Sequence, residues 1–310
     1  MFHEISYLDP LQVFAQFADQ PGSILLDSAQ LRKNCARYSF IAVDPFQTLE
    51  SKNGVIKLDN EVLSGNPFAV LAAQLEKFSQ KKIQGLPPFQ GGAAGFFGYE
   101  LAHHLEDIAM AEKDDMQFPD MALGFYDCVI AFDEQEKRAW IFSNGFPEMD
   151  SQKREQRAHA RLHALHEKIK QTPKFFSHVK NALDKKNLRS NFSMEAYQYS
   201  VRKVIDYILL GDIFEANISQ RFSIKLSENY SAFDLYRKLR SLNAAPFAAY
   251  VNLANTFLVS ASPERFLLLC DRRVETRPIK GTRPRGKNVD EDEMLAKQSF
   301  SSEKDHAANW

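Results

Sequence analysis

The sequence is poor in cysteine, in net charge and in long apolar runs, and each shortage excludes a class of protein. Only three of the 310 residues are cysteines, Cys35, Cys128 and Cys270, and they lie far apart in the sequence. This spacing excludes a zinc ribbon and a disulfide framework, and it predicts reduced thiols in a cytoplasmic protein. The 39 Lys and Arg residues nearly balance the 40 Asp and Glu residues, so nothing in the composition favours binding to nucleic acid or to a membrane surface.

The apolar stretches are short as well. The longest of them, such as 40–43 and 266–270, cannot span a bilayer, and the N-terminus lacks the basic and apolar regions of a signal peptide. The remaining composition, 44% hydrophobic and 25% charged, is typical of a soluble globular protein. The 25 phenylalanines predict a packed core rather than an aromatic binding site.

Short apolar runs alternate with turn residues over the first half of the chain. The runs 23–28, 37–43 and 54–58 predict strands, and the runs 125–132 and 139–142 predict a hairpin around an acidic turn. Asn66 and Pro67 predict the start of a helix. This pattern favours an α+β protein with much antiparallel pairing.

The middle of the chain has a different composition. Residues 150–170 are rich in Lys, Arg, Gln and His and predict a solvated helix, followed by a basic linker over 173–190. His159, His163 and His166 share one face of this helix, but no carboxylate completes a metal-binding set, so we interpret them as solvated residues.

The last third predicts a helix and further strands. Ser193 is the predicted N-cap of a helix that Gly211 ends. Strands are predicted over 213–224 and 247–259, and 265–269 should pair with 274–279.

The run from Arg272 to Lys287 contains seven basic residues and a single acid, Glu275. It is either a solvated basic loop or an anion pocket that uses backbone N–H groups and the Thr282 hydroxyl. Lys280 has several cations nearby in the sequence, which favours a neutral, nucleophilic amine. Glu264 precedes it by sixteen residues, so antiparallel strands could bring the two side chains together. Such a pair is either an acid and a nucleophile or an ordinary cross-strand salt bridge.

Five segments, in this order, resemble motifs of the chorismate-utilising enzymes. They are Arg37–Phe40, Gly95–Tyr99, Gly211–Phe214 continuing to Ser219–Phe222, Ser262–Phe266 and Arg277–Arg285. The last is similar to the P-I-[KA]-G-T-x-P-R motif of the family. The resemblance implies the α+β fold of anthranilate synthase component I, with layered antiparallel β-sheets and surrounding helices. It also implies three segments: an N-terminal region (1–150), a helix and linker (151–190), and the first part of the chorismate-binding catalytic region (191–310).

The lysine in this motif distinguishes two branches of the family. Anthranilate synthase component I typically has alanine there, whereas aminodeoxychorismate synthase component I has lysine, as at Lys280. The resemblance implies conversion of chorismate and ammonia to 4-amino-4-deoxychorismate for folate synthesis, with a glutamine amidotransferase subunit as partner. Lys280 would be the nucleophile, Glu264 the general acid, and Gly281, Thr282 and Arg283 would bind the substrate. The alternatives are anthranilate synthase and a truncated, non-catalytic homologue that binds tryptophan or the amidotransferase.

The resemblance also implies two further ligands. Ser28, Asn243, Pro246 and Phe247 match the family's tryptophan pocket, although core and turn packing would equally explain them. The family binds Mg²⁺, but Ala308 stands where one ligand glutamate is expected, and an alanine cannot ligate this cation. The other ligands are expected beyond Trp310, so we predict no metal ligand in this sequence and a chain truncated relative to its family.

Overall fold

The computed structural model describes residues 1–31, 35–108, 114–171, 185–254, 256–279, 284 and 286–301. Contacts divide the chain into two units: Met1–Lys174 with Tyr236–Trp310, and Phe175–Leu235. The three segments expected from the family (1–150, 151–190 and 191–310) divide the sequence and not the contacts, so these two units do not test them. The three segments stay a prediction. Among the described residues we find no helix with the length and apolarity that crossing a membrane requires.

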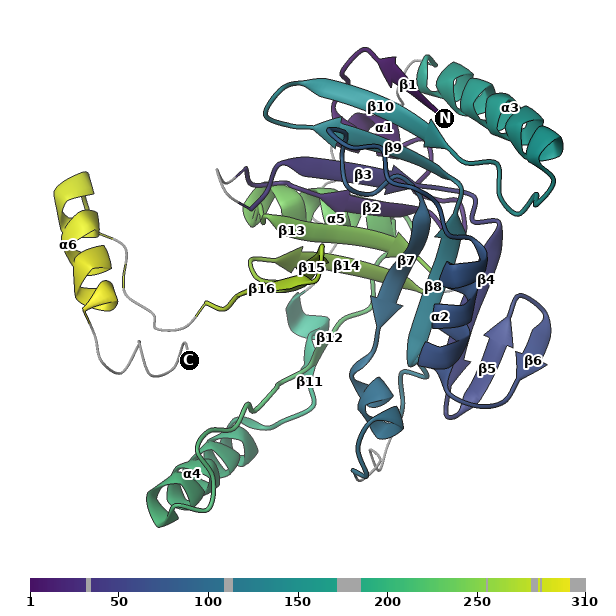
Figure 1. Cartoon of the computed structure of the whole chain (residues 1–310). Helices are drawn as coiled ribbons and strands as arrows, with labels where there is room; N and C mark the ends of the chain where they lie inside the picture. Colours follow the sequence, from purple (N-terminus) through teal and green to yellow (C-terminus); the bar gives the residue numbers. More distant parts are fainter. Residues whose placement is uncertain are drawn as a thin grey trace. The chain divides into compact units, whose positions relative to one another are not determined.

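The larger sheet of the first unit has seven antiparallel strands in the order β1-β10-β9-β3-β2-β13-β14 (Figure 1). Their bounds are β1 Phe2–Ile5, β2 Ile24–Asp27, β3 Tyr38–Ala42, β9 Cys128–Asp133, β10 Arg138–Ser143, β13 Phe247–Asn252 and β14 Phe257–Ser262. Every residue of β9 is buried, so both faces of the sheet are covered at its centre. The register places Leu26 opposite both Phe40 and Ala249, which joins distant parts of the sequence in one surface.

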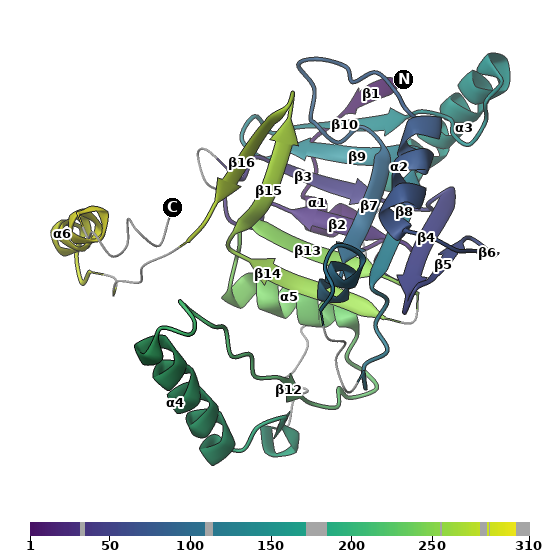
Figure 2. The same cartoon turned by 60° about the horizontal axis from the view of Figure 1, so that its bottom comes forward.

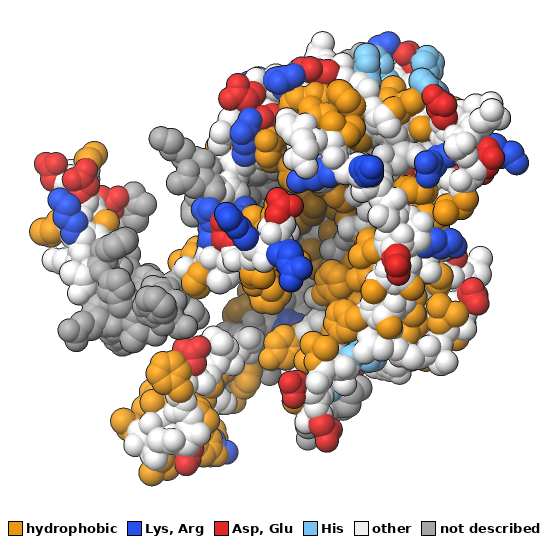
Figure 3. Space-filling model, in the orientation of Figure 1, with side chains coloured by type: hydrophobic (Ala, Val, Ile, Leu, Met, Phe, Trp, Pro, Cys, Tyr) orange, Lys and Arg blue, Asp and Glu red, His pale blue; other side chains and the backbone are white. Residues whose placement is uncertain are grey.

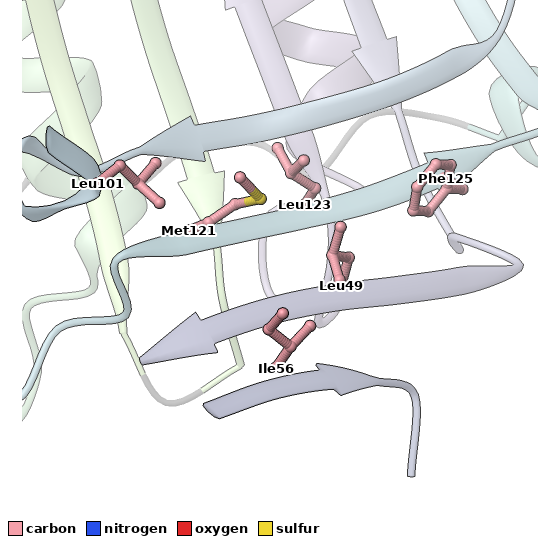
Figure 4. Close-up of a cluster of buried hydrophobic side chains, with 6 residues drawn as sticks. All are labelled: Leu49, Ile56, Leu101, Met121, Leu123 and Phe125. Atoms are coloured by element: carbon pink, nitrogen blue, oxygen red, sulfur yellow. The ribbon is translucent and has the colours of Figure 1, made fainter. Parts of the chain in front are cut away.

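The smaller sheet has five antiparallel strands in the order β6-β5-β4-β8-β7. Their bounds are β4 Gln47–Lys52, β5 Val55–Leu58, β6 Glu61–Leu63, β7 Gly92–Phe97 and β8 Met121–Tyr126. Figure 4 shows the core on one side of this sheet, formed by Leu49, Ile56, Leu101, Met121, Leu123 and Phe125. At Gly95 a Cβ atom would overlap the Ala122 carbonyl oxygen, so the close approach of β7 to β8 requires glycine there.

Helices cover both sheets. Their bounds are α1 Pro10–Phe14, α2 Pro67–Lys77, the 3₁₀ helix η1 Tyr99–His104, α3 Ser151–Ile169 and α5 Ala232–Leu242, and a further helix, α6, spans Val289–Phe300. Helices α1 and α5 both contact Tyr250 of β13 in the larger sheet. The ring centroid of Tyr250 lies 5.4 Å from that of Phe14 in α1 and 5.8 Å from that of Tyr236 in α5. Helix α2 packs on the core of the smaller sheet (Figure 2). The α+β prediction, with layered antiparallel sheets and outer helices, is confirmed.

The second unit contains η2 Lys185–Asn187, β11 Arg189–Ser190, α4 Met194–Leu210 and β12 Phe222–Ser223. The limits predicted for α4 are confirmed: the Ser193 hydroxyl accepts from the Ala196 N–H at 3.1 Å, and Gly211 is left-handed at φ 81°. The strand predicted over 213–224 is wrong except for β12. A strand needs a hydrogen-bonding partner, and among the described residues of this unit only β11 supplies one.

Two predicted strands in the first unit are divided. The run 247–259 forms β13 and β14, which pair with each other. The run 125–132 is interrupted at Asp127, where the chain passes from the smaller sheet (β8) to the larger one (β9). The Asp127 side chain is fully buried, and its Oδ1 lies 3.0 Å from Nε of Arg161 in α3. Arg161 thus lies beside the carboxylate at the crossing point, which strand propensity alone does not indicate.

Candidate functional site

A hairpin carries the candidate general acid. Strands β15 (Arg265–Cys270) and β16 (Arg273–Arg277) pair antiparallel as predicted, although β16 ends before Ile279. Asp271 and Arg272 form its tip at φ 48° and 65°, the left-handed backbone that a tight two-residue hairpin turn requires. Arg265 lies opposite Arg277 at the open end, so the residues that flank these two positions come together.

Glu264 directly precedes β15 at this open end. Its Oε1 accepts a hydrogen bond from the Ile279 N–H at 3.2 Å, and the Ser262 hydroxyl donates to its backbone carbonyl at 3.1 Å. The carboxylate therefore lies beside the residue that precedes Lys280. Lys280, Gly281, Thr282, Arg283 and Ala308 lie outside the described residues, so their roles remain predictions.

A cavity of about 640 Å³ opens between β2, β3, β13 and the β15–β16 hairpin. Three of the four residues matched to a tryptophan pocket line it: Ser28, Pro246 and Phe247. Its other lining residues include Leu26, Cys35, Tyr38, Phe40, Pro88, Leu268 and Cys270, together with the charged Asp27, Arg37, Arg265, Glu275 and Arg277. The cavity thus combines apolar and aromatic walls with hydroxyl and guanidinium groups, a combination that suits a flat apolar ligand carrying a charged end.

Hydrogen bonds hold Ser28 and its neighbour in place. The Ser28 hydroxyl donates to the Tyr38 carbonyl at 2.7 Å, and the Ser28 N–H donates to the Ser39 hydroxyl at 3.1 Å. The buried carboxylate of Asp27 accepts from the Tyr236 hydroxyl and from Arg240 Nε, both at 2.6 Å. Burial and this neighbouring carboxylate raise the pKa of Tyr236, which keeps its hydroxyl a donor.

Asn243 is placed apart from the other three matched residues. Its backbone N–H donates to the Leu239 carbonyl at 2.8 Å at the end of α5, its side chain is exposed, and it is not among the residues that line the cavity. Pro246 and Phe247 follow shortly after Asn243 in the sequence; Pro246 is buried and Phe247 is half-buried. The structure therefore brings together Ser28, Pro246 and Phe247, but not Asn243.

The hairpin wall of the cavity is charged. Oε1 of Glu275 lies 2.6 Å from Arg277 Nε and 2.6 Å from Arg265 Nη1. The hydrogen bond from Arg277, with help from Arg265, holds the pKa of the Glu275 carboxyl below its usual value. Arg265 also donates from Nη2 to the Cys35 carbonyl at 3.2 Å, and its guanidinium carbon lies 5.2 Å from the Phe247 ring centroid. Figure 3 shows acidic and basic side chains close together over this hairpin, beside an apolar hollow.

Sequence reasoning missed several of these residues. Glu275 and Arg277 stood in the basic run, and their same-face spacing on a predicted strand could have drawn attention to them. Arg265 directly follows Glu264, yet the sequence gives no sign that it would reach Glu275. Cys35 and Cys270 line the same cavity as free thiols, and no local pattern could have joined two residues so distant in sequence.

The described residues offer no cluster of three or more His, Cys, Asp or Glu side chains that could hold a metal ion. The expectation of Mg²⁺ comes from the resemblance alone. Ala308, at the expected position of one ligand, has no oxygen to offer. The described residues, and Ala308 by its chemistry, therefore do not fit a magnesium site, and we derive no chemical step through this ion.

Comparisons with known proteins bear on almost the whole chain. The family profile described as chorismate binding enzyme matches residues 23–309. Anthranilate synthase component 1 of Acetivibrio thermocellus is 33% identical over 308 residues, which cover 96% of this chain and 62% of that protein. Aminodeoxychorismate synthase component 1 of Bacillus subtilis is 30% identical over 313 residues, covering 99% of this chain and 63% of the relative.

A solved structure shows the same fold. The crystal structure of anthranilate synthase component I from Streptococcus pneumoniae superimposes with a TM-score of 0.72 at 25% identity, over 90% of this chain and 60% of that one. The chain thus spans somewhat less than two thirds of the length of these relatives. The two relatives compared by sequence carry the names of two different enzymes, anthranilate synthase and aminodeoxychorismate synthase, at similar identities of 33% and 30%.

Proposed function

Since this chain belongs to the family of chorismate binding enzymes, we propose that it acts on chorismate as an aminodeoxychorismate synthase component I. One observation carries the choice between the two branches: Lys280 occupies the motif position at which anthranilate synthases typically have alanine. The Bacillus subtilis relative with the aminodeoxychorismate synthase name supports this choice, while the Acetivibrio thermocellus relative keeps anthranilate synthase as the second candidate.

In the proposed reaction, the Lys280 amine adds to C2 of chorismate. The ring double bond shifts, and the C4 hydroxyl leaves as water with a proton from Glu264. Ammonia then adds at C4, the double bond shifts back, and Lys280 is released from C2 while Glu264 takes up a proton. The hydrogen bond from the Ile279 N–H to Glu264 supports this pairing, because it places the acid next to the residue before Lys280. Gly281, Thr282 and Arg283 are proposed to hold the carboxylates of the substrate.

We assign the cavity of Ser28, Pro246 and Phe247 to tryptophan as a second proposal. Its volume of about 640 Å³, its aromatic and apolar walls and its three guanidinium groups suit an aromatic amino acid. Asn243 belongs to this proposal through the family match alone. A glutamine amidotransferase subunit that supplies ammonia is the proposed partner, because both named relatives are component 1 proteins.

The product of the reaction tests the proposal. The chain is incubated with chorismate and ammonia, and the product is identified by mass spectrometry. We expect 4-amino-4-deoxychorismate, which retains the enolpyruvyl group, whereas anthranilate has lost it as pyruvate. Lys280→Ala should abolish the product, and Lys297→Ala in α6 is the matched control. Anthranilate as product would favour the second candidate, and tryptophan binding without turnover would favour a non-catalytic binding protein.

A further inference from the structure

Two cations face each other at the open end of the hairpin. Arg265 and Arg277 are paired directly across β15 and β16, an arrangement in which like charges repel and destabilise the pairing. A single oxygen compensates both of them, because Glu275 Oε1 lies 2.6 Å from Arg265 Nη1 and 2.6 Å from Arg277 Nε. We refer to Arg265, Glu275 and Arg277 as the Glu275 bridge.

The bridge lies next to the predicted proton donor. Arg265 directly follows Glu264, and Arg277 is two residues before Ile279, whose N–H donates to the Glu264 carboxylate at 3.2 Å. The register of the strands shifts between Arg265 and Leu268, so regular ladder hydrogen bonds do not fix this end. The Thr276 hydroxyl donates to the Phe266 carbonyl at 2.9 Å, and the ionic contacts of Glu275 form a second link between the two strand ends.

Arg265 also connects the bridge to the core of the first unit. Its Nη2 donates to the Cys35 carbonyl at 3.2 Å, and its guanidinium group packs over the half-buried ring of Phe247. The guanidinium group of Arg265 thus has three partners: a carboxylate, a carbonyl and an aromatic ring. Planar guanidinium groups are suited to such combined contacts, and the result is a fixed position for the residue next to Glu264.

We propose that Glu275 is a positioning residue: by bridging Arg265 and Arg277 it holds the Glu264 carboxylate against the Ile279 N–H. This inference rests on the proposed function, since it takes Glu264 as the proton donor. The Ile279 N–H occupies Oε1 of Glu264, so the transferable proton resides on Oε2 and passes from there to the departing C4 hydroxyl. Glu275 itself touches neither the substrate nor the reacting atoms.

Turnover of chorismate with ammonia tests the positioning role. Glu275→Gln keeps the size of the side chain and one acceptor oxygen but removes its charge, and we expect kcat to fall about tenfold with KM unchanged. Glu61→Gln on the exposed strand β6 is the matched control and should behave as the wild type. Removing one of the two cations should relieve the repulsion, so Glu275→Gln combined with Arg277→Gln should recover part of the loss. An unchanged kcat in Glu275→Gln would overturn the proposal.

Hydrogen exchange at the Ile279 amide tests the same contact without any turnover. We expect exchange in Glu275→Gln to be about tenfold faster than in the wild type and equal to that in Glu264→Ala, with the melting temperature unchanged. Unchanged exchange would overturn the proposal whatever the activity. If the wild-type chain does not convert chorismate, the proposed function fails, and the exchange rates still decide whether Glu275 holds Glu264 in place.

Discussion

Arginine–carboxylate contacts occur in two kinds of place in the first unit. The side chains of Asp27 and Asp127 are 1% and 0% exposed, and they are paired with Arg240 and Arg161 respectively. Glu275, between Arg265 and Arg277, is 42% exposed. A buried carboxylate without its cation is very costly, whereas an exposed ion pair adds little stability. The same chemistry therefore secures the fold in the interior and sets local geometry at the surface, where the Glu275 bridge lies beside Glu264.

The buried contact of Asp127 should give the largest effect on stability. Arg161→Met retains the bulk of the side chain but removes its contacts with Asp127 and Asp44; among the described residues, Arg157 then remains beside Asp127, with its Nε 3.7 Å from Oδ2. We expect the free energy of unfolding to fall by roughly 3–5 kcal/mol, measured by urea denaturation followed by circular dichroism. Lys153→Met, an exposed change on the same helix, should stay within about 0.5 kcal/mol of the wild type. Equal stabilities for the two variants would contradict the structural role of this pair.

The contact of Asp27 should have an intermediate effect. Asp27→Asn retains an acceptor oxygen for the Tyr236 hydroxyl or for Arg240 but removes the negative charge between them. We expect a loss of about 1–3 kcal/mol in the same denaturation experiment, because a charge-assisted hydrogen bond inside the protein is weakened. Asp107→Asn, at an exposed position, serves as its control. We infer that Asp27→Asn lowers the free energy of unfolding less than Arg161→Met does. An equally large loss in the two variants would contradict this inference.

The exposed Glu275 bridge should have the smallest effect on global stability of the three contacts. Its effect should appear locally, as a dependence on pH. Arg277 and Arg265 hold the pKa of Glu275 below its ordinary value of 4.5, so the folded hairpin favours the ionised carboxylate. This contribution is present above the unfolded pKa and is lost as the pH falls through the lower, folded one. We therefore expect protection of the Ile279 amide to decrease on acidification below pH 4.5, measured by NMR in a Glu264→Gln background that keeps an acceptor oxygen. If Glu275→Gln shows the same acid transition in that background, the transition does not belong to Glu275.

Local signals in the sequence predicted much of the fold. The Ser193 cap and Gly211 gave the limits of α4, and the turn residues around Asp271 indicated the β15–β16 hairpin. The prediction failed for most of residues 213–224, because among the described residues only Phe222 and Ser223 of this run have a partner strand, and at Asp127, where the chain crosses between the two sheets beside Arg161. Both failures concern contacts between segments far apart in the sequence.

The candidate site was predictable to a smaller extent. The resemblance named Ser28, Pro246 and Phe247, and the structure brings them into one cavity. The contact of Glu264 with Ile279 agrees with the expectation that neighbouring strands carry Glu264 and the start of the lysine motif. The Glu275 bridge was beyond sequence reasoning, because it depends on the register of β15 and β16 and on the shift between Arg265 and Leu268.

The covalent step tests the central claim, the use of Lys280 and Glu264 on chorismate, most directly. The chain is incubated with chorismate in the absence of ammonia, digested and mapped by mass spectrometry. We predict an adduct of chorismate less one water on Lys280, absent in Lys280→Ala and formed more slowly in Glu264→Gln. Product formation in Lys280→Ala upon addition of ammonia, or an adduct on a different lysine, would contradict the account.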